Sequence, residues 1–189
     1  MKKNFLIVAF LLLSSSILAQ QPKTILVVYY SSSGNTQLMA EAIAEGATSV
    51  EDVKVKLLRT DEASEKDILD ADAIIIGSPV YNASVAPAVM EYINSWPFEG
   101  KPLKNKLGAA FSTGGGISIG EELVLQQLIQ AMLIQGMIIV GGDQTESAFG
   151  ASGITGEAPF DKGKLAPIFL EKGFGLGKRV AEVTKKFNP

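Results

Sequence analysis

The period of the apolar positions changes repeatedly along the chain, and five short apolar runs predict β-strands. The runs cover residues 23–30, 53–58, 73–77, 107–112 and 137–140. The second run alternates apolar and charged side chains, which is typical of an edge strand with one face in water. The third run is entirely apolar, which is typical of a central strand.

Between the strands, apolar residues recur at the spacing of helices with one buried face. The predicted helices cover residues 36–48, 85–96, 121–135 and 165–187. The third of these begins with two acidic residues and is followed by Gly136, and both features are typical of helix ends.

Strands that alternate with helices predict an α/β fold in which helices cover both faces of a parallel sheet. With right-handed crossovers, a five-stranded doubly wound sheet of order 2-1-3-4-5 fits best. We expect one domain, residues 23–187. Ligands bind such sheets at the carboxyl ends of the strands, so the loops beginning at Ser31, Ser78 and Ser112 are the candidate site.

The first nineteen residues have a different pattern. Lys2 and Lys3 precede an apolar stretch, residues 5–19, that ends in a small residue, Ala19. This stretch is shorter than the roughly 20 residues that span a bilayer, so it predicts a cleavable signal peptide rather than a membrane anchor. We therefore expect an exported, periplasmic protein that is soluble after cleavage.

Composition excludes several kinds of chemistry. The chain has no cysteine and no histidine, which excludes disulfides, thiol catalysis and a histidine general base. We expect no metal site, because a transition metal would have only carboxylates to bind. Loss of residues 1–19 leaves 15 basic and 20 acidic side chains, a net charge of −5, which argues against nucleic acid as a partner.

The loop after the first strand carries four hydroxyl side chains next to a predicted helix start. It consists of Ser31, Ser32, Ser33, Gly34, Asn35 and Thr36. Helix N-termini attract anions, and Gly34 allows close approach of the backbone. A nucleoside triphosphate loop would need lysine where Asn35 stands. The neutral donors therefore favour a single phosphate monoester, and the alternative is a serine or threonine N-cap.

The spacing Ser-x-Ser-Gly-x-Thr after an apolar strand resembles the FMN-phosphate loop of flavodoxin-like proteins. Residues 71–90 and 111–116 resemble the family's two loops around the flavin ring. Residues 135–140 and 149–151 resemble the tryptophan-repressor-binding-protein (WrbA-type) NAD(P)H:quinone oxidoreductases in particular.

That resemblance implies a flavodoxin-like three-layer fold with FMN as the cofactor. Residues 31–36 would hold the phosphate, and main-chain groups of two further loops would hold the ring. These loops consist of Pro79, Val80, Tyr81 and Asn82, and of Ser112, Thr113, Gly114, Gly115 and Gly116. Tyr81 would stack on the ring, with Trp96 or Phe98 over its open face; core packing is the alternative for each aromatic residue.

The resemblance implies an NAD(P)H:quinone reductase in which the flavin, rather than any catalytic side chain, carries the electrons. The donor would be NAD(P)H or another reductant, and the acceptor a quinone or another small molecule. The family often has a His-His pair where this chain has Ile134-Gln135. An electron-transfer flavodoxin and a non-catalytic binding module therefore stay open as alternatives, as does a homo-oligomer.

Two glycine motifs resemble other sites. Residues 116–120 match G-x-S-x-G, but a serine hydrolase needs a histidine that the chain lacks. Residues 173–177 read GxGxG within a helical pattern and follow no strand, so close helix packing is the better interpretation than a dinucleotide site.

Overall fold

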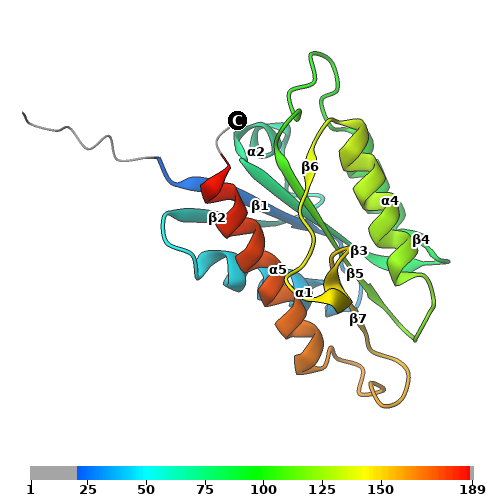
Figure 1. The fold of residues 1–189 in the computed structure, drawn as a ribbon. Helices are drawn as coiled ribbons and strands as arrows, with labels where there is room; N and C mark the ends of the chain where they lie inside the picture. The colour runs from blue at the N-terminus through cyan, green and yellow to red at the C-terminus, as the bar shows by residue number, and fades with distance from the viewer. Residues whose placement is uncertain (1–20, 188–189) are drawn as a thin grey trace, which may run out of the picture.

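The computed structural model describes residues 21–187, which form an open sheet with helices on both faces (Figure 1). The strands are β1 (Lys23–Tyr29), β2 (Val53–Arg59), β3 (Ala73–Tyr81), β4 (Ser84–Val85), β5 (Leu107–Gly114), β6 (Ile138–Ile139) and β7 (Ala151–Ile154). The α-helices are α1 (Asn35–Thr48), α2 (Glu65–Asp70), α3 (Pro87–Asn94), α4 (Glu121–Ile134) and α5 (Pro167–Lys186), and η1 (Thr145–Ser147) is a 3₁₀ turn.

The sheet has the order β2-β1-β3-β5-β6, and every pairing along this path is parallel. These are the five predicted strands in the predicted order. Val27 in β1 pairs with Leu57 and with Ile75, and Ile75 pairs with Ala109. The carboxyl ends of β1, β3 and β5 consequently lie at the same edge of the sheet.

The last strand departs from the prediction, because it consists of two short pieces. β6 pairs with the start of β5, and β7 pairs with its end, Phe111 opposite Ala151. Residues 140–150 leave the sheet between them and include Gly141, Gly142 and η1. The predicted strand at residues 137–140 therefore supplies only half of the edge.

Besides β7 and η1, two short elements were not predicted. The six-residue helix α2 buries only Ile68, so it has no apolar period to detect, but a capping box of Ser64 and Asp67 marks its start. β3 continues past the predicted residue 77 and forms an antiparallel hairpin with β4.

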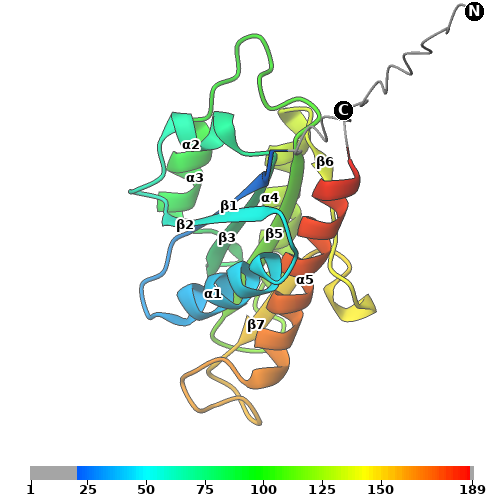
Figure 2. The same cartoon turned by 90° about the vertical axis from the view of Figure 1, so that its left-hand side faces the viewer.

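Alternate residues of each strand face different layers, as the pleat requires. In β1, Ile25 and Val27 face a core with α1 and α5, whereas Leu26 and Val28 face a core with α2, α3 and α4. Figure 2 shows α1 and α5 side by side on the first face. This is the three-layer α/β arrangement that the sequence predicts.

Glycines allow α1 and α5 to approach each other closely. A Cβ on Gly177 would overlap the carbonyl oxygen of Ile43, and one on Gly46 would overlap the carbonyl oxygen of Phe174. A Cβ on Gly173 would lie 2.7 Å from Sδ of Met39. The prediction that residues 173–177 serve helix packing is confirmed.

The predicted signal peptide lies outside the described residues. Within residues 21–187, no helix combines the length and the apolar character that a membrane span requires.

Gly177→Ala should lower the free energy of unfolding by about 3 kcal/mol, because the new methyl group has to push two helix backbones apart. Lys178→Ala, at the exposed neighbouring position, is the control and should change stability by less than about 0.5 kcal/mol. Urea denaturation followed by circular dichroism measures both. Equal midpoints for the two variants would contradict the close approach at Gly177.

Candidate functional site

The loop after β1 presents an uncapped helix N-terminus. Gly34 is the N-cap of α1, with φ +88°, and no side chain caps the helix. The Ser31 hydroxyl instead accepts a hydrogen bond from the N–H of Gly34, at 3.1 Å. The first N–H groups of α1 have no acceptor within the helix, so they are available to an anion. The alternative of a simple serine or threonine N-cap does not occur.

Two hydroxyl contacts connect this loop to the other two candidate loops. Thr36 and Thr113 share a buried hydrogen bond between their Oγ1 atoms at 2.8 Å. The Tyr81 hydroxyl donates to Oγ of Ser32 at 3.2 Å. Three segments that are distant in the sequence therefore meet at one place, as expected from the parallel strand order.

The second loop is the β3–β4 hairpin. Its two central residues, Asn82 and Ala83, have φ of 50° and 58°, the left-handed pair that a two-residue type I′ turn needs. Ala83 adopts this conformation at a cost of about 1 kcal/mol. Gly120 supports the turn, since a Cβ there would lie 2.6 Å from Cα of Ala83. The hairpin places the ring of Tyr81 nearly perpendicular to that of Tyr30, with the ring centroids 6.4 Å apart.

The third predicted loop, residues 112–116, begins within the sheet, because β5 continues past the predicted residue 112 to Gly114. Its two polar side chains, Ser112 and Thr113, are buried. The Ser112 hydroxyl donates to the carbonyl oxygen of Glu121 at 3.1 Å, so it anchors α4. The Thr113 hydroxyl is used by Thr36. Gly114 is buried and Gly115 is exposed, so what this loop offers a ligand is chiefly its main chain.

Arg59 is a part of the site that the sequence analysis did not identify. Its Nη1 atom donates to the carbonyl oxygen of Ser31 at 3.4 Å, and its guanidinium lies 5.9 Å and 6.0 Å from the ring centroids of Tyr29 and Tyr30. The positive charge of Arg59 therefore lies next to the loop of residues 31–36, where the sequence analysis expected only neutral donors. Arg59 reaches the loop because it ends β2 opposite Tyr29 of β1, and this register is known only from the structure.

The structure contradicts the expectation that Trp96 or Phe98 covers a flavin ring. Trp96 is 4% exposed and packs edge-on against Tyr92 in the core below α3. Phe98 is exposed but lies after α3, in the connection that leads to the amino end of β5. Helix α3 starts beside the site and runs away from it, so both residues lie near the opposite edge of the sheet. Tyr81 alone of the three belongs to the site.

A pocket of about 580 Å³ adjoins the second and third loops. It is lined by Ala83, Ser152 and the segment from Ile117 to Leu123.

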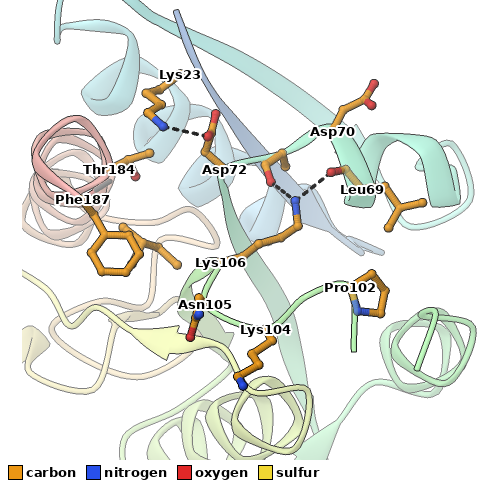
Figure 3. A pocket seen from close by; sticks show the side chains of 12 residues that line it. Lys23, Leu69, Asp70, Asp72, Pro102, Lys104, Asn105, Lys106, Thr184 and Phe187 are labelled. Atoms are coloured by element: carbon orange, nitrogen blue, oxygen red, sulfur yellow. Dashed lines mark hydrogen bonds and ion pairs between the residues drawn. The ribbon is translucent and has the colours of Figure 1, made fainter. Parts of the chain in front are cut away.

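Another cavity, of about 420 Å³, lies at the opposite edge of the sheet, where Lys106 donates to the carbonyl oxygens of Leu69 and Ala71 (Figure 3). Burial lowers the pKa of Lys106. Beside it, Lys23 forms an ion pair with Asp72 at 3.1 Å, which links the start of β1 to the start of β3.

FMN fits the edge of the sheet at the carboxyl ends of β1, β3 and β5. A phosphate matches the uncapped N-terminus of α1 with its neighbouring hydroxyls, and main-chain groups of the hairpin and of residues 114–116 match the polar edge of a flavin ring.

Comparison with known proteins agrees with this geometry. The family described as NADPH-dependent FMN reductase matches residues 24–151. An iron–sulfur flavoprotein of Methanocaldococcus jannaschii is 38% identical over 122 residues, which are 64% of this chain and 62% of that protein. The chain thus spans less than two thirds of this relative.

Two further relatives are matched over more of their length. A flavodoxin of Aquifex aeolicus is 30% identical over 79% of this chain and 80% of its own. An NAD(P)H dehydrogenase (quinone) of Archaeoglobus fulgidus is 28% identical over 82% of this chain and 93% of its own. The crystal structure of a WrbA-like flavodoxin from Agrobacterium tumefaciens superposes with a TM-score of 0.72 at 25% identity, over 88% of this chain and 99% of that one.

Thr36→Val should weaken FMN binding about tenfold, because it removes a hydroxyl at the uncapped N-terminus and leaves Thr113 without its partner. Riboflavin, which has no phosphate, should lose much less. The control is Thr48→Val at the exposed end of the same helix. Flavin fluorescence titration measures both affinities. Equal losses for the two flavins would show that Thr36 does not serve the phosphate.

Proposed function

We propose that the chain is an FMN-dependent reductase that transfers two electrons from NAD(P)H or another reductant to a quinone or a similar small acceptor. The chain belongs to the NADPH-dependent FMN reductase family. The observation that carries the proposal is the meeting of three loops at the carboxyl ends of β1, β3 and β5. Bound FMN supplies the ability to accept a hydride equivalent from one molecule and to reduce another.

The chain's own residues bind and orient. The α1 N-terminus and its hydroxyls hold the phosphate, and Arg59 adds a positive charge behind them. The hairpin and residues 114–116 present main-chain groups to the ring. Overall, NAD(P)H, a proton and a quinone give NAD(P)⁺ and a hydroquinone, and solvent can supply the proton. The reaction therefore needs no histidine or cysteine.

Electron transfer between proteins is the second candidate, favoured by the similarity to a flavodoxin and by the absence of the His-His pair at Ile134-Gln135. The 189 residues contain no cysteine to bind a cluster like that of the iron–sulfur relative. The similarity to an NAD(P)H dehydrogenase (quinone) over 82% of the chain supports the reductase.

An exported location is part of the proposal and rests on residues 1–19 alone. NAD(P)H is scarce outside the cytoplasm, and there another reductant would supply the two electrons to the flavin.

Anaerobic titration of the FMN-loaded protein with NADPH tests the reductase. We expect full bleaching of the flavin absorbance by one equivalent and full recovery on addition of one equivalent of menadione. No reaction with NADPH or NADH, together with reduction by dithionite in two resolved one-electron steps, would favour the carrier. Failure to bind FMN would leave only a binding module.

A homo-oligomer is proposed from an uncharged segment of the chain that carries exposed apolar side chains. No charged residue occurs from Leu123 to Gly142, and within this segment Leu133 and Ile134 on α4 and Ile138 on the edge strand β6 are exposed. The chain as a whole is negatively charged, so two copies meet with least repulsion at this face. A row of exposed apolar side chains beside an edge strand is typical of an interface.

Ile134→Glu should convert the oligomer into a monomer, because the charge would be buried at the interface. Thr48→Glu adds the same charge on the opposite face of the sheet and should leave assembly unchanged. Light scattering after size exclusion measures the mass. A monomeric wild-type protein would rule out this interface.

A further inference from the structure

The pocket beside the flavin loops begins where those loops end. The ring is assigned to residues 79–82 and 112–116, and the pocket is lined by the next residues on each side, Ala83 and the segment from Ile117 to Leu123. The lining thus shares no residue with the assigned ring loops but continues both. A molecule in the pocket would adjoin whatever those loops hold.

Three large aliphatic side chains are exposed around the pocket, beside the polar residues Ser118 and Glu122. Ile117, Ile119 and Leu123 are 48%, 41% and 56% exposed, and Ala83 lies next to them. Three large aliphatic side chains exposed around one hollow are typical of a binding site for an apolar molecule.

Two glutamate carboxylates accept hydrogen bonds from backbone N–H groups around the pocket. The Glu121 carboxylate accepts the N–H groups of Ile119 and Gly120, both at 3.0 Å. The Glu157 carboxylate accepts the N–H of Ile117 at 2.7 Å. The loop N–H groups that immediately precede α4 are therefore bound to carboxylates, whereas no side chain caps the first N–H groups of the helix itself.

The net charge of the lining is negative. Glu121 and Glu122 belong to it, Glu157 touches it, and no lysine or arginine is among the residues that line it. The partial positive charge of a helix N-terminus is about half a unit, so two carboxylates in the first turn of α4 outweigh it. The start of α1, at the same edge of the sheet, has no such carboxylates and has Arg59 behind it.

We propose that this pocket receives the apolar head of the electron acceptor and selects uncharged or cationic acceptors over anionic ones. The inference rests on the proposed function, and it names the class of acceptor. The two helix N-termini then differ in the charge they accept. The N-terminus of α1 binds the phosphate, whereas the glutamates at the start of α4 repel a second anion.

The test uses FMN-loaded protein reduced anaerobically with dithionite, so that it does not depend on NAD(P)H. Three naphthoquinones serve as probes: one uncharged, one with a sulfonate and one with a quaternary ammonium group. Stopped-flow reoxidation should be at least about fivefold slower for the sulfonate than for the uncharged quinone, after correction for their rates with free reduced FMN. The difference should shrink in 0.5 M salt.

Glu122 is the residue to change, because it is exposed and its carboxylate has no hydrogen bond among the described residues. Glu122→Lys should raise the rate with the sulfonated quinone about fivefold and lower the rate with the cationic one. Glu99→Lys makes the same change of charge in the connection at the other edge of the sheet and should alter neither. Equal effects of the two variants would show that only the net charge matters and would overturn the proposal.

Equilibrium binding gives a readout without turnover. Calorimetry with the oxidised, FMN-loaded protein should show that Leu123→Gln weakens binding of the uncharged quinone about fivefold while the FMN affinity stays within twofold. A large loss of FMN affinity would assign the pocket to the flavin itself and overturn the proposal. Unchanged quinone binding would also overturn it. Failure of NADPH to reduce the protein would concern only the proposed function.

Discussion

Parallel pairing of β1 with β3 and of β3 with β5 brings the carboxyl ends of three strands to one edge of the sheet, and the site depends on this constraint. Thr36 and Thr113 are 77 residues apart in the chain, yet their hydroxyl groups share a hydrogen bond at that edge. A buried hydroxyl without a partner would be costly, so this pair also fixes the position of α1 against β5. The loop proposed to hold the phosphate and a loop proposed to hold the ring are therefore held together by the protein itself.

The rest of the molecule supports this edge by close packing. Gly46 and Gly177 allow α5 to lie against α1, and α1 in turn carries the N-terminus proposed to bind the phosphate. On the other face, Ser112 holds the start of α4, and Gly120 supports the strained turn at Ala83. The two faces thus position two helix starts at one edge. The carboxylates beside α4 and the guanidinium behind α1 give these starts opposite electrostatic character.

The sequence predicted the strand order and the three loops because each depends on local pattern or on parallel topology. The split of the last strand into β6 and β7 could not be foreseen, since β7 reads Ala-Ser-Gly-Ile and has little strand character of its own. Trp96 and Phe98 were misplaced because sequence distance from a motif ignores the direction of α3. Arg59 was missed because its role follows from cross-strand register with Tyr29, which only tertiary structure defines. Ser112 lies in the predicted loop, but the structure gives its hydroxyl to α4.

The most direct test of the central claim, that these three loops form one FMN site, is a map of backbone amide chemical shifts as FMN is added to the flavin-free protein. The account predicts the largest changes at residues 31–36, 80–82 and 113–116, with little change at residues 103–107 around the cavity at the opposite edge. Large changes confined to that opposite edge, or none at the N-terminus of α1, would contradict it.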